Sequence, residues 1–350
     1  MRVVVTGATG NVGTSVLRAL VDEPAVESVL GIARRLPELR LPKVDWAAAD
    51  ISRADLTPHL RGADAVVHLA WLIQPSRDEE TLRATNLDGS RRVFAAAAEA
   101  GVGTLAYASS VGAYSPGPKD SRVDESWPTG GIESSFYARH KAAVERALDD
   151  FERESPSVRV VRLRPALIFK RDAATGIRRL FAGPFLPGAL LRPGLIPFVP
   201  RTKRLRFQAV HSLDVGEAFR LALTREVRGA FNIAAEPVLD GAELARTLDA
   251  RELRVDPRLL RAAADLSWRL RLQPSESGWV DMALAVPLLD TTRARNELGW
   301  TPGRDARAAL LELLDGMRTG AGLETPPLSP KTGGPLRLRE LLSGVGGRSI

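Results

Sequence analysis

Cysteine is absent from the sequence, and histidine occurs only four times. The lack of thiols excludes disulfides, thiolate nucleophiles and cysteine-ligated metals. The histidines lack the spacing of a zinc site, so we expect no metal centre. The valine-rich start of the chain is too short to cross a membrane, and prolines and glycines interrupt the apolar stretch 182–200. We therefore expect a cytoplasmic protein without a membrane partner.

Lysine is also scarce, with six residues, so arginine carries most of the positive charge behind the formal net charge of +7. A basic surface attracts nucleic acids, membranes and phosphorylated small molecules. The sequence contains no long basic run and no nucleic-acid-binding motif. Scattered arginines, with a few at an anion site, explain the charge best. We expect a small-molecule substrate and no nucleic-acid partner.

Short β-branched runs alternate with helical patterns in the N-terminal half. The predicted strands are 2–6, 28–33, 44–49, 65–70, 103–109 and 158–163, and the predicted helices are 11–20, 78–100 and 136–153. Such alternation produces βαβ crossovers and a parallel sheet. The sequence therefore predicts an α/β protein with a Rossmann-type, doubly wound parallel sheet in residues 1–169, to which residues 206–233 contribute.

The composition changes after residue 169. Residues 182–200 are dense in proline, glycine and leucine, and helical patterns follow near 241–249, 257–270 and 304–317. We predict that residues 170–315 mainly form a smaller, substrate-binding lobe. The tail 318–350 is rich in glycine and proline, and we expect it to be flexible except for a short helix at 336–342.

Three glycines at positions 7, 10 and 13 follow the first predicted strand and open the first helix. The first permits a tight turn, the second lets the backbone approach a pyrophosphate, and the third allows close packing. The helix N-terminus adds amide hydrogens and a positive dipole end. The predicted dinucleotide site comprises Gly7, Thr9, Gly10, Asn11, Val12 and Gly13.

The end of the second strand bears on the choice of cofactor. Sites for NAD usually have an acidic residue there, whereas this sequence has Ala33 followed by Arg34 and Arg35. Guanidinium groups pair with a 2′-phosphate, so NADP is the preferred cofactor and NAD the alternative. Two exposed loop arginines without a ligand are the competing interpretation. Asp50 and Ile51 follow the third strand, where the carboxylate would bind the adenine or cap a helix.

Tyr137 and Lys141 stand four residues apart on a predicted helix and share one face. An ammonium group near the phenol would lower the pKa of the tyrosine and make it a better proton acceptor. The tyrosine would then exchange a proton with a hydroxyl or carbonyl group while a nicotinamide exchanges the hydride. Ser110, at the end of the fifth strand, is placed to bind the substrate oxygen.

These motifs occur in an order typical of one family. They are Thr6–Gly13, Asp50-Ile51, His68-Leu69-Ala70, Asn86, Ser109-Ser110, Tyr137–Lys141, Arg164-Pro165, Val210–Val215, Phe231–Ile233 and Leu298–Pro302. Over about residues 1–315 the chain resembles extended short-chain dehydrogenases of the NAD-dependent epimerase/dehydratase family. The resemblance implies that Tyr137 is the acid/base, Lys141 also holds the nicotinamide ribose, and Ser110 orients the substrate. It further implies a cofactor cleft with contributions from His68, Leu69, Ala70, Asn86 and Pro165, and a homodimer through the helices 78–100 and 136–153.

Departures from the family pattern bear on the substrate. Ser110-Val111-Gly112 lacks the acid pair of nucleotide-sugar dehydratases, which argues against water elimination. Leu167 stands where many nucleotide-sugar enzymes have an asparagine for the diphosphate. Substrate contacts are assigned to Ser109, Arg204 and Arg206, the arginines as part of an anion site with Arg201 and Lys203, although a solvated basic loop explains them equally well.

Three functions remain open on the sequence. The first is an epimerase or oxidoreductase that acts on a sugar or nucleotide sugar. The second is an NADP-dependent ketone or steroid-like alcohol dehydrogenase, which Leu167 and the apolar region 181–198 favour. The third is a cofactor-binding sensor without turnover, against which the intact Ser110, Tyr137 and Lys141 argue.

The arginines after the second strand generate a test. We expect Arg34→Ala to weaken NADP binding by about 1.5–3 kcal/mol, or about 10- to 100-fold, because a charge-assisted contact with the 2′-phosphate is lost. NAD binding should change little. Titration of both cofactors into both proteins measures this, and an equal preference in the two proteins would show that Arg34 is a surface residue only.

Overall fold

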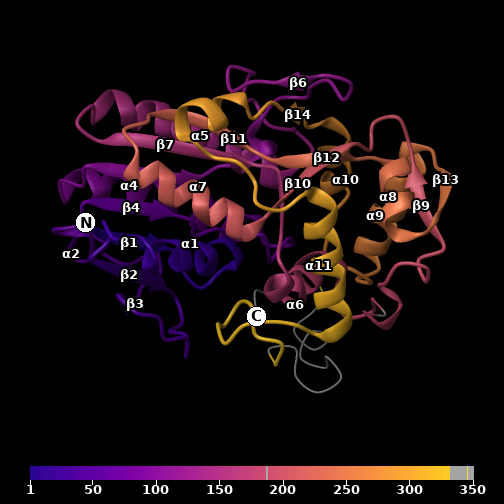
Figure 1. Ribbon diagram of the computed structural model, residues 1–350, viewed down its shortest axis with the longest axis horizontal. Helices are drawn as coiled ribbons and strands as arrows, with labels where there is room; N and C mark the ends of the chain where they lie inside the picture. The colour runs from indigo at the N-terminus through magenta and orange to yellow at the C-terminus, as the bar shows by residue number, and fades with distance from the viewer. Residues whose placement is uncertain (187, 332–344, 346–350) are drawn as a thin grey trace.

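The computed structural model describes residues 1–186, 188–331 and 345. A seven-stranded sheet forms its centre, in the order β11-β7-β5-β4-β1-β2-β3, and all of its strands are parallel (Figure 1). The strands are β1 (Arg2–Thr6), β2 (Ser28–Ala33), β3 (Val44–Ala48), β4 (Ala65–His68), β5 (Thr104–Ala108), β7 (Arg159–Pro165) and β11 (Gly229–Ile233). The predicted fold class is therefore confirmed. Because the strand order reverses at β1, a crevice is expected where β1 and β4 end.

Helices pack on both faces of this sheet. They are α1 (Asn11–Val21), α2 (Thr57–Leu60), α3 (Glu79–Arg83), α4 (Gly89–Glu99), α5 (Phe136–Glu154) and α7 (Ser212–Thr224). A π-helical turn over Ala84–Asp88 joins α3 to α4, so the predicted helix 78–100 is one helical run. Residues of α1 and α7 share one hydrophobic cluster with the sheet, and residues of α4 and α5 share the other.

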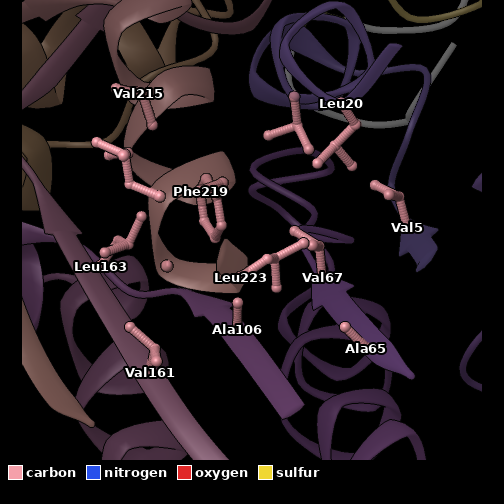
Figure 2. Packing of buried hydrophobic residues seen from close by; sticks show 14 of the residues in the cluster. Val5, Leu20, Ala65, Val67, Ala106, Val161, Leu163, Val215, Phe219 and Leu223 are labelled. Atoms are coloured by element: carbon pink, nitrogen blue, oxygen red, sulfur yellow. The ribbon is translucent and has the colours of Figure 1, made fainter. Parts of the chain in front are cut away.

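The contact between α1 and α7 depends on a small residue. Phe219 and Leu223 of α7 pack beside Leu20 of α1 over the buried strands (Figure 2). A Cβ at Gly216 would lie 2.6 Å from the carbonyl oxygen of Ser15. The two backbones therefore approach each other too closely for any residue larger than glycine at this position.

Smaller sheets and further helices stand beside the central sheet. The sheets are β12-β10-β8, β13-β9 and β14-β6, built from β6 (Arg122–Val123), β8 (Leu167–Phe169), β9 (Phe198–Arg201), β10 (Phe207–His211), β12 (Ala235–Leu239), β13 (Arg251–Arg254) and β14 (Leu288–Leu289). The helices are α6 (Ala174–Ile177), α8 (Gly241–Leu248), α9 (Pro257–Arg269), α10 (Gly278–Ala285) and α11 (Ala306–Thr319). The segment 206–233, which the sequence assigns to the central sheet, belongs to two parts of the fold. Strand β10 joins a small sheet, whereas α7 and β11 belong to the central layers.

Residues 320–331 fold back against the body of the protein. Thr175 donates a hydrogen bond from Oγ1 to the carbonyl oxygen of Ala321 at 2.7 Å, and Thr325 and Leu328 are buried. This part of the predicted flexible tail is packed in the structure, its flexibility stays a prediction, and the predicted helix 336–342 lies outside the described residues. Within residues 1–186, 188–331 and 345, no helix is both long and apolar enough to span a bilayer.

The α1–α7 contact yields a stability prediction. Although alanine favours helices by about 1 kcal/mol over glycine, we expect Gly216→Ala to lower the free energy of unfolding by about 1–3 kcal/mol, because the added methyl group displaces backbone. Thr224→Ala, at the half-buried end of the same helix, serves as the control and should change it by less than about 1 kcal/mol. Urea unfolding measures both, and a stabilised Gly216→Ala protein would contradict the close approach.

Candidate active site

The loop between β1 and α1 has the geometry that its glycines predict. Gly7 has a φ of +68°, and a Cβ there would lie 2.6 Å from the backbone nitrogen of Ala70. A Cβ at Gly13 would lie 2.3 Å from the carbonyl oxygen of Gly7. Among the described residues, a Cβ at Gly10 would contact only the same carbonyl oxygen of Gly7, at 3.3 Å. Gly10 therefore faces the open side of the loop, which fits a pyrophosphate against the N-terminus of α1.

A cavity of about 700 Å³ lies over this loop, at the carboxyl ends of the central strands. Its wall brings together most of the residues predicted for cofactor binding and catalysis. These residues are Gly7, Thr9, Gly10, Asn11, Val12, Gly13, Arg34, Arg35, Leu69, Ser109, Ser110, Tyr137, Lys141 and Pro165. The two predicted halves of the site therefore meet in one cavity.

Four residues predicted to contact the cofactor lie outside this wall: Asp50, Ile51, Ala70 and Asn86. The Asp50 carboxylate accepts hydrogen bonds from the backbone nitrogen and hydroxyl of Ser52, at 3.0 and 2.7 Å. The Asn86 side chain is fully buried and binds the backbone nitrogen and oxygen of Leu72, at 2.7 and 2.8 Å. These polar groups shape the loops around the cavity instead of facing into it.

The phenol of Tyr137 lies between two indole rings. The ring centroids of Trp71 and Trp279 are 5.9 and 5.0 Å from its own. Burial raises the pKa of Tyr137, while a hydrogen bond with Ser110 acts in the opposite direction. The sequence predicts a pKa lowered by Lys141, and this expectation is wrong for the protein alone. Desolvation disfavours the phenolate, so the phenol keeps its proton at neutral pH.

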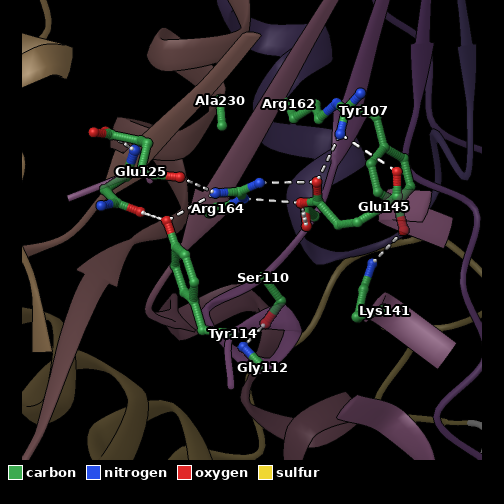
Figure 3. Close-up of polar contacts among 12 residues, drawn as sticks. Tyr107, Ser110, Gly112, Tyr114, Glu125, Lys141, Glu145, Arg162, Arg164 and Ala230 are labelled. Atoms are coloured by element: carbon green, nitrogen blue, oxygen red, sulfur yellow. Dashed lines mark hydrogen bonds and ion pairs between the residues drawn. The ribbon is translucent and has the colours of Figure 1, made fainter. Parts of the chain in front are cut away.

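The ammonium group of Lys141 is directed toward β5. Its Nζ donates a hydrogen bond to the carbonyl oxygen of Ala108 at 2.6 Å. It donates another to the hydroxyl of Tyr107 at 3.3 Å (Figure 3). It lies 3.6 Å from the ring centroid of Trp71 but 5.9 Å from that of Tyr137. Burial lowers the pKa of Lys141 well below its usual value, and a carboxylate one turn along α5 partly opposes this. Distance and desolvation together explain why Lys141 does not favour the phenolate.

That carboxylate belongs to Glu145, whose side chain is 1% exposed. Nε and Nη2 of Arg164 each donate to it at 2.9 Å, and Nη1 of Arg162 donates at 3.0 Å (Figure 3). Burial alone would raise the pKa of Glu145, but the two guanidinium groups lower it to about 2. Ser109, which the sequence assigns to the substrate, donates its hydroxyl to the same carboxylate. The cluster fastens α5 to β7 and to the end of β5.

His68 is a buried structural link. It shares hydrogen bonds with the hydroxyls of Thr6 at 2.7 Å and Ser90 at 2.9 Å. Burial, and after it the charge of Lys141, lowers the pKa of His68 to about 3. The neutral ring therefore joins β1, β4 and α4 beneath the cavity. The described part of the chain contains no cluster of histidine and acidic side chains that would hold a metal ion.

The rest of the cavity wall is largely apolar, and sequence reasoning missed most of it. It includes Trp71, Leu72, Ile73, Leu180, Phe181, Leu205, Phe207, Trp279, Met282 and Val286. The region 181–198 carried an apolar signal, but Trp71 and Trp279 stand in segments without a recognisable motif. The structure brings these segments together over Tyr137.

Polar side chains on this part of the wall bind nearby backbone. Gln74 donates to the carbonyl oxygen of Leu180 at 2.9 Å. Gln208 donates to the carbonyl oxygen of Leu289 at 3.2 Å and accepts from its backbone nitrogen at 2.7 Å. Their hydrogen bonds are used within the protein, so they add little polarity to the cavity.

The basic residues predicted for the substrate lie outside the cavity wall. Arg204 donates to the carbonyl oxygens of Leu284 and Gly117, at 3.0 and 3.2 Å. Nε of Arg206 lies 3.9 Å from the carboxylate of Asp240. The expected anion site does not form in the cavity, because these side chains turn to other parts of the lobe.

Residues 3–234 match the NAD dependent epimerase/dehydratase family. The chain belongs to this family. An uncharacterized protein of Mycobacterium tuberculosis is 28% identical over 326 residues, which cover 92% of this chain and 31% of the relative. The chain thus spans about a third of the length of that relative.

The chain is also similar to one further protein and to one solved structure. Sterol demethylase protein B of Methylococcus capsulatus is 27% identical over 343 residues, covering 89% of this chain and 97% of that protein. The structure of UDP-glucose 4-epimerase from Thermotoga maritima superposes with a TM-score of 0.68 at 19% identity, covering 91% and 99% of the two chains. The latter likeness shows a common fold.

Lys170 directly follows β8 and is not among the site residues predicted from the sequence. The side chain is buried, and Nζ donates to the carbonyl oxygen of Asn11 at 3.1 Å and to the hydroxyls of Thr14 and Ser15 at 2.8 and 3.2 Å. Burial lowers the pKa of Lys170 to about 8. The residue ties the end of β8 to the first turn of α1, next to the glycine loop.

The buried carboxylate generates a stability prediction. We expect Glu145→Gln to lower the free energy of unfolding by about 3–5 kcal/mol, because the buried guanidinium group of Arg164 loses its counter-charge, while Arg162 keeps Asp149 and Glu152. Asp149→Asn is the matched control. Asp149 also pairs with Arg162, at 2.6 Å, but its side chain is 59% exposed, so the loss should stay below about 1 kcal/mol.

The same cluster predicts a dependence on pH. Because the pKa of Glu145 is lowered from 4.5 to about 2, its ionised form stabilises the fold above the unfolded-state value. This contribution is lost as the pH falls from about 4.5 toward 2. Urea unfolding of the wild type and both variants at neutral and acidic pH measures it, and equal losses in the two variants would contradict the assigned role.

Proposed function

We propose that this protein is an NAD(P)-dependent oxidoreductase that interconverts a carbonyl and a hydroxyl group on a largely apolar substrate. The observation that carries the proposal is the wall around Tyr137, where aromatic and aliphatic side chains predominate and Gln74 and Gln208 bind backbone. Apolar walls favour ligands that bury apolar surface. The name of the Methylococcus capsulatus relative, sterol demethylase protein B, supports the same substrate class.

The residues present fit a dinucleotide. Gly10 leaves room for the pyrophosphate, and Arg34 and Arg35 lie on the cavity wall without an acidic residue at position 33. We propose that these arginines bind the 2′-phosphate and that NADP is preferred over NAD. When bound, the nicotinamide exchanges a hydride with a substrate carbon.

Tyr137 is proposed as the proton donor for the reduction of a ketone. Its raised pKa keeps the proton on the phenol at neutral pH, where it can pass to the carbonyl oxygen as that oxygen gains negative charge. Ser110 is proposed to orient the same oxygen, and Lys141 to hold the nicotinamide ribose. Trp71 and Trp279 pack against the half-buried ring of Tyr137 and would limit the access of water to its hydroxyl when a substrate is bound.

A nucleotide sugar is the second candidate substrate. Arg179 lies on the cavity wall near Leu180, and a guanidinium group there would pair with a diphosphate. The Thermotoga maritima enzyme of similar fold acts, by its name, on UDP-glucose. Water elimination is not proposed, because Val111 and Gly112 stand where dehydratases have their acid pair.

The homodimer expected from the sequence is retained as a proposal. Residues of α4 and α5 contribute to one hydrophobic cluster on the same face of the central sheet. Ala95 is exposed on the outer side of α4, where a small residue permits close helix packing. A two-fold axis beside these helices would form the expected four-helix bundle, in keeping with a cytoplasmic enzyme.

The role of Tyr137 is tested with ketone reduction by NADPH. We expect Tyr137→Phe to lower kcat by at least about 100-fold while cofactor affinity is kept, because only the proton donor is removed. In the wild type, reduction should fall and alcohol oxidation should rise as the pH increases toward the raised pKa of Tyr137.

Tyr114→Phe is the matched control. Its hydroxyl binds Asn232 and Arg164, at 2.7 and 3.0 Å, outside the cavity wall. We expect the Tyr114→Phe protein to be less stable than the wild type but to keep most of its kcat per folded molecule. Full activity in Tyr137→Phe would contradict the mechanism, and cofactor binding without turnover of any ketone or nucleotide sugar would favour a sensor.

A further inference from the structure

Helix α9 has a second apolar stripe that faces solvent. None of its residues is buried, and its inward side is formed by half-buried residues such as Leu260, Ala264 and Trp268. On the other side, Leu259, Leu266 and the capping residue Leu270 are 65%, 59% and 60% exposed. Their spacing of seven and four residues places them on one side of the helix.

More exposed apolar side chains lie on the elements beside α9. Strand β13, just before the helix, pairs with β9, and Leu253 and Phe198 on these strands are about half exposed. Figure 1 shows α9, β9 and β13 together at one end of the molecule, away from β1, β2 and β3. We call this region the α9 face; it comprises Phe185, Phe198, Leu253, Leu259, Leu266, Leu270 and Leu272.

The segments that form the α9 face are strongly basic. Residues 173–213 contain seven lysines and arginines and no acidic residue, and residues 251–272 contain six arginines and three acidic residues. Not all of this charge is free at the surface: Arg178 is buried, Arg179 lies on the cavity wall, and Arg201, Arg261 and Arg269 pair with acidic side chains. Arg258 and Arg269 are exposed next to the leucine stripe. Exposed leucines flanked by arginines are typical of helices that lie in the interface of an anionic bilayer.

The α9 face also adjoins the apolar cavity. Gly183 and Pro184 lie on the cavity wall directly before Phe185, and Pro274 lies on it two residues after Leu272. A Cβ at Gly183 would lie 3.2 Å from Pro274, so the two segments touch. Phe185 and Leu272, at one edge of the α9 face, therefore stand next to the rim of the proposed substrate site.

We propose that the α9 face docks on an anionic lipid bilayer, in place of the absence of a membrane partner that the sequence alone predicts. A second copy of the chain is the less suitable occupant, because it would bring two arginine-rich faces together. Docking would place the cavity rim against the acyl region, from which an apolar substrate enters without crossing water. This last step rests on the proposed function, whereas docking itself does not.

Co-flotation of the full chain with vesicles tests the proposal without any substrate. We expect binding to phosphatidylcholine vesicles that contain about one third phosphatidylglycerol, and much weaker binding to phosphatidylcholine alone or at high salt. The triple variant Leu259→Ser, Leu266→Ser, Leu270→Ser should bind roughly 30-fold more weakly. Arg258→Gln should weaken binding about fivefold, since each arginine near the surface contributes about 1 kcal/mol.

Leu36→Ser is the matched control, because Leu36 is 54% exposed and follows β2 at the other end of the molecule. It should bind like the wild type, and the triple variant should still reduce a water-soluble ketone. Absent flotation, or equal binding by the triple variant, would overturn the proposal. So would a dimer, seen by light scattering, that the triple variant abolishes. Flotation without turnover of any ketone would support docking and reject the proposed function instead.

Discussion

Glu145 accepts two hydrogen bonds from Arg164 and a third from Arg162 in a place that solvent does not reach. The same helix carries Lys141 one turn and Tyr137 two turns earlier, so the ion pairs decide where both side chains stand relative to the sheet. Ser109 adds the end of β5 to this arrangement, next to Ser110. Buried ion pairs add little stability over an apolar replacement but are costly to break. Their effect here is to specify one position for α5.

Desolvation gives the site its chemical character. The same enclosure raises the pKa of Tyr137 and lowers that of Lys141, so both groups are biased toward their neutral forms. A neutral phenol suits proton donation to a carbonyl oxygen better than proton removal from an alcohol. The chemistry and the substrate class are therefore linked, because the apolar side chains that shift the pKa values of Tyr137 and Lys141 also form the proposed substrate wall.

The family fold and the substrate wall come from different parts of the chain. The central sheet and its glycine loop supply the half of the cavity that we propose for the cofactor. Segments inserted after β4 and β8 and around α10 supply the rest. Fold alone does not select a substrate. The lining residues Trp71, Phe181 and Trp279 favour an apolar ligand, and the exposed leucines of α9 favour contact with a lipid surface.

The sequence by itself determined the central fold, the glycine loop and the Tyr137–Lys141 pair. These features follow from local periodicity and from the steric needs of single residues, which are written in neighbouring positions. Glu145 continues the spacing of four residues from Tyr137 and Lys141 on α5, but only the packing of this helix against β7 shows that it binds Arg162 and Arg164.

Only the tertiary structure decided the rest. Short strands such as β8 and β10 carry no local signal for the sheet that they join. Asn86 bonds to backbone and Lys170 reaches α1 because packing brings distant segments together. The pKa of Tyr137 moved against the sequence expectation for the same reason: its shift depends on how much water Trp71 and Trp279 exclude, and desolvation is set by long-range packing rather than by the spacing of residues along the chain.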